Sequence, residues 1–156
     1  MKAQVETTGA MTVRMTTESE HGVQLRTLSR ALQDVHRGLL EVSRERYELA
    51  NGPVRSKGDL LQLLLHDETF AWLRPLSGLI VEIDELAARD DAPTGAETAA
   101  MGALVQAFTS SSDDPEAFGS RYVALLSSEP RVAMSHIGLR DALAGLPKPR
   151  AGVGTG

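Results

Sequence analysis

Four histidines are the side chains of this protein best suited to chemistry, because the sequence contains no cysteine. His36, His66 and His136 occur within apolar helical patterns, whereas His21 lies outside them. Three imidazole rings brought together from three helices could bind a divalent metal or a haem. However, no two of these histidines are separated by the short sequence spacing that is typical of two metal ligands on one helix. The favoured interpretation is that each ring is hydrogen-bonded separately at the edge of the core.

Glu68 is the acidic residue of most interest, because helical periodicity places it on an apolar face between Leu65 and Trp72. A carboxyl group buried there would have a raised pKa and could act as a general base. The favoured alternative is that Glu68 forms an ion pair with an arginine or lies where the core meets water. The sequence indicates no second catalytic group beside Glu68 or a histidine, so it favours a non-enzymatic protein.

Phe70 and Trp72 form an aromatic cluster just before Pro75. A kink at the proline would separate neighbouring helices, and the cluster could then line a pocket for a small apolar molecule. The same side chains would suit a dimer interface or ordinary core, and core is the favoured interpretation. The candidate ligand-binding residues are therefore His36, His66, Glu68, Phe70, Trp72 and His136. Only His66 and His136 are candidate metal ligands.

The elements that must position these residues are helical, since strong helix formers dominate and aromatic residues make up only 4%. Leucine and valine recur at alternating three- and four-residue steps through residues 25–49, which is typical of a bundle seam. A leucine-rich stretch over residues 57–89 predicts a helix covered on more than one side. Shorter helical patterns follow, with caps expected at Thr94 and Asp114 and a helix start at Pro130.

These patterns predict an all-α fold, an up-and-down bundle of four to five helices whose second helix is kinked or broken at Pro75. A single domain should span residues 17–146 and begin with a capping box of Thr17 and Glu20. Residues 1–16 are expected to be disordered, and residues 147–156 to form a flexible tail.

Two segments resemble a known family. Residues 56–76 (SKGDLLQLLLHDETFAWLRPL) and 134–146 (MSHIGLRDALAGL) are similar to helices of DinB/YfiT-type four-helix bundles. The resemblance implies a divalent metal held by one histidine of the second helix and two of the last. Only His66 and His136 match that pattern. Val132 stands where the third ligand would be, so the implied site would be incomplete.

Charge and composition exclude several function classes. A net charge of −5 argues against a dedicated nucleic-acid binder. Four arginines share one face of the first helix, but nearby acids predict a solvated, ion-paired surface; they are Arg26, Arg30, Arg37 and Arg44. Polar residues at 66–68 interrupt the apolar stretch, so no membrane span is expected. The absence of cysteine is compatible with a cytoplasmic location.

Three functions remain open on the sequence alone. The first two helices carry more apolar surface than so few partner helices need, which favours an interaction or scaffold module that forms a homodimer or binds a protein partner. The alternative is a bundle holding a metal, haem or small apolar molecule near His66, His136 and Trp72. An enzyme using Glu68 or a histidine as base is the third. No cofactor is the favoured expectation, with a divalent metal or haem as the alternative.

Overall fold

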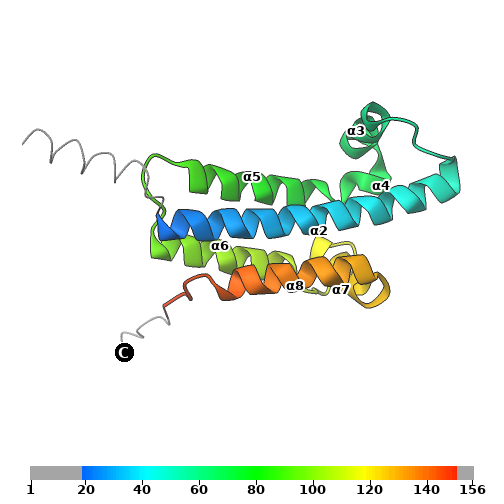
Figure 1. Cartoon of the computed structure of the whole chain (residues 1–156). Coiled ribbons are helices and arrows are strands. Elements are labelled where there is room, and N and C mark those ends of the chain that lie inside the picture. Colours follow the sequence, from blue (N-terminus) through cyan, green and yellow to red (C-terminus); the bar gives the residue numbers. More distant parts are fainter. Residues whose placement is uncertain (1–18, 151–156) are drawn as a thin grey trace, which may run out of the picture.

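The computed structural model describes residues 19–150, and their only regular secondary structure is helical, which confirms the all-α class. Predictions for residues 1–16 and for the last part of the tail lie outside the described residues. The helices are α2 (Glu20–Asn51), α3 (Lys57–His66), α4 (Glu68–Ala71), α5 (Arg74–Ala88), α6 (Gly95–Phe108), α7 (Phe118–Ser128) and α8 (Pro130–Ala144) (Figure 1).

Helix α2 is the axis of the molecule, and α5 and α8 pack along its length (Figure 1). Its predicted seam is buried from Leu25 to Val42, where the side chains are at most 2% exposed. The prediction was wrong for Leu49, which is 89% exposed. The last turns of α2 extend past α5 and α8, which pack along the rest of the helix (Figure 1).

Helix α2 begins later than predicted. Thr17 lies outside the described residues, and the N-cap is Ser19, whose Oγ accepts a hydrogen bond from the Gly22 N–H at 3.0 Å. The helix ends as expected at Gly52, which has a φ of 87° that favours glycine.

The stretch over residues 57–89 is broken into three helices rather than kinked. Asp67 ends α3 and caps α4, since its carboxylate accepts a hydrogen bond from the Thr69 N–H at 2.8 Å. Trp72 and Leu73 form a turn, and Pro75 then occupies the first turn of α5. A proline is tolerated there because the first N–H groups of a helix have no partner within it. The break therefore precedes the proline.

The C-terminal helices close the core. Thr94 caps α6 as predicted, with its Oγ1 accepting from the Glu97 N–H at 3.0 Å. Helix α7 starts at Phe118 rather than after Asp114, because Asp114 instead accepts the Glu116 N–H in a local turn. Helix α8 starts at Pro130 as expected and packs against α2 and α7.

Candidate functional site

The three candidate histidines have different neighbours. His136 on α8 is half-buried, and its Nδ1 lies 2.8 Å from the hydroxyl oxygen of Tyr122, which is fully buried on α7. His36 on α2 is also half-buried, and its Nε2 lies 3.1 Å from Ser77 Oγ on α5. His66 is exposed at the last position of α3. Both half-buried rings are thus satisfied locally.

Glu68 is exposed on α4, so the expectation of a buried carboxyl group was wrong. Periodicity predicts an apolar face for Glu68 only if residues 57–89 form one continuous helix. The break at Asp67 changes that phase. Among residues 19–150, no three histidine, aspartate or glutamate side chains lie close enough together to hold a metal ion.

Burial lowers the pKa of both His36 and His136, and the positive charge of Arg140 lowers that of His136 further. When the His136 ring is neutral, its Nδ1 can accept the proton of the buried Tyr122 hydroxyl. A protonated ring would remove that acceptor. The geometry therefore favours a neutral His136 in the folded protein.

This geometry predicts a pH-dependent stability. Below the ordinary pKa of 6.5, the unfolded chain binds a proton at His136 more readily than the folded chain does. Stability is therefore fully present above that pH and falls as the pH drops toward the lowered folded pKa. We expect His136→Asn to reduce the fall in the urea midpoint between about pH 7 and about pH 5. His66→Asn, at an exposed position, is the matched control. Equal pH slopes in wild type and His136→Asn would contradict this assignment.

An aromatic stack joins the turn that follows α4 to the end of α6 and the first half of α7. Phe118 lies at its centre, with ring centroids 4.3 Å from Phe108, 5.5 Å from Trp72 and 5.7 Å from Tyr122. Phe70 instead packs against Tyr47, at 5.8 Å. Of the two predicted aromatic site residues, Phe70 is thus fully buried core, whereas Trp72 is only half-buried.

The exposed edge of Trp72 faces a groove of about 390 Å³ between α2, α4 and α7. Two arginines line this groove, Arg46 from α2 and Arg121 from α7, and no acidic side chain lines it. The Arg121 guanidinium lies 6.0 Å from the centre of the Trp72 ring, within cation–π range. Sequence reasoning missed both arginines, because each by itself has the pattern of an ordinary surface residue.

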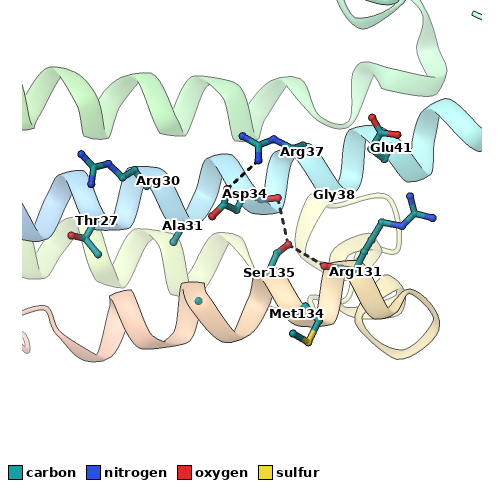
Figure 2. A pocket seen from close by; sticks show the side chains of 11 residues that line it. Thr27, Arg30, Ala31, Asp34, Arg37, Gly38, Glu41, Arg131, Met134 and Ser135 are labelled. Atoms are coloured by element: carbon teal, nitrogen blue, oxygen red, sulfur yellow. Dashed lines mark hydrogen bonds and ion pairs between the residues drawn. The ribbon is translucent and has the colours of Figure 1, made fainter.

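A larger groove of about 590 Å³ runs between α2 and α8 (Figure 2). Its charges are mixed and mostly paired. Arg37 lies 3.6 Å from Asp34, and Arg131 lies 2.9 Å from Glu45. The Ser135 hydroxyl lies 3.0 Å from the backbone carbonyl oxygen of Arg131 and 3.4 Å from that of Asp34, and it can donate its one proton to either (Figure 2). Paired acids and arginines of this kind match the ion-paired outer face that the sequence predicts for α2.

Helix α3 carries the most unusual surface of the described chain. It has five leucines in ten residues, and none of its residues is buried. Three of them, Leu60, Leu63 and Leu64, are half-buried and pack against the core. We call the exposed pair, Leu61 and Leu65, the leucine surface. Leu61 is 52% exposed and Leu65 is 51% exposed. The prediction of a helix covered on more than one side was wrong for α3, because one face packs against the core while Leu61 and Leu65 on another face are exposed.

Comparisons of the chain with models of known protein families, with curated proteins and with solved structures return no match. Within residues 19–150, no helix combines the length and the apolar character that crossing a bilayer requires.

Proposed function

We propose that this protein is a non-enzymatic interaction module that self-associates through the leucine surface of α3. The observation that carries the proposal is the exposure of Leu61 and Leu65 on a helix that has no buried residue. Exposed leucines clustered on one helix lose contact with water when they pack against another molecule, and this burial drives association. We propose that the longer helices α2, α5, α6, α7 and α8 form an up-and-down bundle, with the shorter α3 and α4 attached to it.

The occupant that best fits this surface is a second copy in antiparallel orientation. Helical periodicity places Leu61 and Leu65 on one face of α3 together with Lys57 and Gly58. An antiparallel pair would pack Leu61 of each copy against Leu65 of the other, and Gly58 would allow close approach. Neither Lys57 nor Glu68 forms an ion pair within the described residues.

Charge complementarity favours this orientation. Lys57 lies at the N-terminal end of α3, and Glu68 lies just beyond its C-terminal end. In the antiparallel pair, Lys57 of each copy would face Glu68 of the other, which gives two opposite-charge contacts. A parallel pair would place like charges together. The face is small, so we expect a weak dimer with a dissociation constant on the order of micromolar.

The test is sedimentation velocity over a series of protein concentrations. Leu61→Glu and Leu65→Glu should each shift the protein to monomer, because a charge would be buried in the interface without a designed partner. Val81→Glu on α5 is the matched control, since Val81 is 53% exposed but lies outside the leucine surface. A wild-type protein that stays monomeric at all concentrations, or equal loss of association in Val81→Glu, would refute the proposal.

A charge swap tests the orientation separately. Lys57→Glu alone should weaken the dimer several-fold, because it places two acidic pairs across the interface. Adding Glu68→Lys to that variant should restore association. If the single and double variants associate equally, the antiparallel pairing is wrong even if a dimer exists.

A further inference from the structure

The groove beside Trp72 combines an indole ring, two arginines and a lining without acidic side chains. It is lined by residues of three elements: Ser43 and Arg46 of α2, Thr69 of α4, and Arg121, Leu125 and Ser128 of α7. Its volume of about 390 Å³ lies within the range of small-molecule sites. The lining therefore has room for a small ring-containing ligand.

The charged side chains that line the groove are all positive, although the net charge of the protein is −5. Arg46 is exposed and forms no hydrogen bond or ion pair with the rest of residues 19–150. Arg121 pairs with Glu116, which does not line the groove. The net positive charge at the groove is therefore carried by Arg46, and its guanidinium has five donors in a planar fork that matches a carboxylate.

Its apolar wall is rigid. The Trp72 ring stacks on Phe118 at 5.5 Å with an interplanar angle of 30°, and Phe118 is held in turn by Phe108 at 4.3 Å. Leu125, 5% exposed, adds a buried aliphatic surface. A flat ring placed against the exposed edge of Trp72 would lie on a preformed surface, so little ordering would be needed to bind it.

We propose that this groove binds a small aromatic carboxylate, with the carboxylate held by Arg46 and Arg121 and the ring packed against Trp72. The hydroxyl groups of Thr69 and Ser128 supply further polar contacts at the rim. This site is separate from the leucine surface, and the inference does not depend on self-association.

Trp72 is the only tryptophan of the chain, so intrinsic fluorescence reports on this groove directly. We would titrate the purified full-length protein with benzoate and with 3-phenylpropionate, and use benzamide as the uncharged match for benzoate. The expected result is a saturable change with at least one carboxylate, with a dissociation constant on the order of millimolar or tighter. Benzamide should bind more weakly by about tenfold or more.

Arg46→Gln removes the positive charge and should weaken carboxylate binding by about tenfold or more, while leaving the response to benzamide unchanged. Arg30→Gln is the matched control, because Arg30 is another exposed arginine of α2 that lines a different groove. Thermal unfolding of both variants checks that each is folded. The proposal is overturned if neither carboxylate gives saturation, if benzamide binds as tightly as benzoate, or if both variants behave alike.

Discussion

Replacing Gly119 by alanine is expected to destabilise the protein by about 3 kcal/mol or more. A Cβ atom at this position would lie 1.8 Å from the Ser110 carbonyl oxygen and 2.9 Å from that of Phe108. Both obstacles are backbone atoms, so relief requires the first turn of α7 to move away from the end of α6. That movement would also disturb the aromatic stack around Phe118.

The measurement is urea unfolding followed by circular dichroism. Gly78→Ala is the matched control, because no heavy atom lies within 4 Å of a Cβ built at this exposed position of α5. We expect that control to stabilise the protein by roughly 0.5–1 kcal/mol, since alanine has the higher helix propensity. A Gly119→Ala protein as stable as wild type would show that α7 does not approach the end of α6 so closely.

Replacing Phe118 by alanine should cost about 3–5 kcal/mol, the range for truncating a buried aromatic ring. Phe118 is only 7% exposed and contacts three aromatic rings, so its removal leaves a cavity that rigid neighbours cannot fill. Phe118→Leu should cost less because it retains most of the volume.

Trp72 fluorescence provides a second, local readout of the same change. Because Phe118 lies against the indole, we expect Phe118→Ala to shift the emission to longer wavelength before any unfolding. Val123→Ala on the same helix is the control, since Val123 is 37% exposed and should change stability little. Equal losses of stability in Phe118→Ala and Val123→Ala would contradict the central place of Phe118 in the core.

The proposed dimer and the proposed ligand groove use different chemistry. Association through α3 depends on exposed leucines, whereas the groove depends on an arginine whose charge no acid in the described chain neutralises. A variant at Leu61 should leave benzoate binding intact, and a variant at Arg46 should leave the sedimentation profile intact. The metal site implied by the resemblance to DinB/YfiT-type bundles stays a prediction, to which the described residues add no third ligand.

The sequence by itself determined the helical class and several of the helix boundaries, because helix caps and apolar periodicity depend on residues close together in the chain. Thr94 caps α6, Gly52 ends α2, and Pro130 opens α8, each as its residue type predicts. The seam from Leu25 to Val42 is buried because its spacing matches the helical period.

Only the tertiary structure decided which apolar faces are covered and which distant side chains meet. Periodicity shows that a face is apolar, but not whether another helix reaches it, so Leu49, Leu61 and Leu65 were expected in the core and are exposed. Likewise, Arg46 of α2, Trp72 of the turn before α5 and Arg121 of α7 come together in one groove, and no local pattern encodes such a long-range contact. The two proposals rest on an apolar face of α3 that stays exposed and on a groove that separate elements form together.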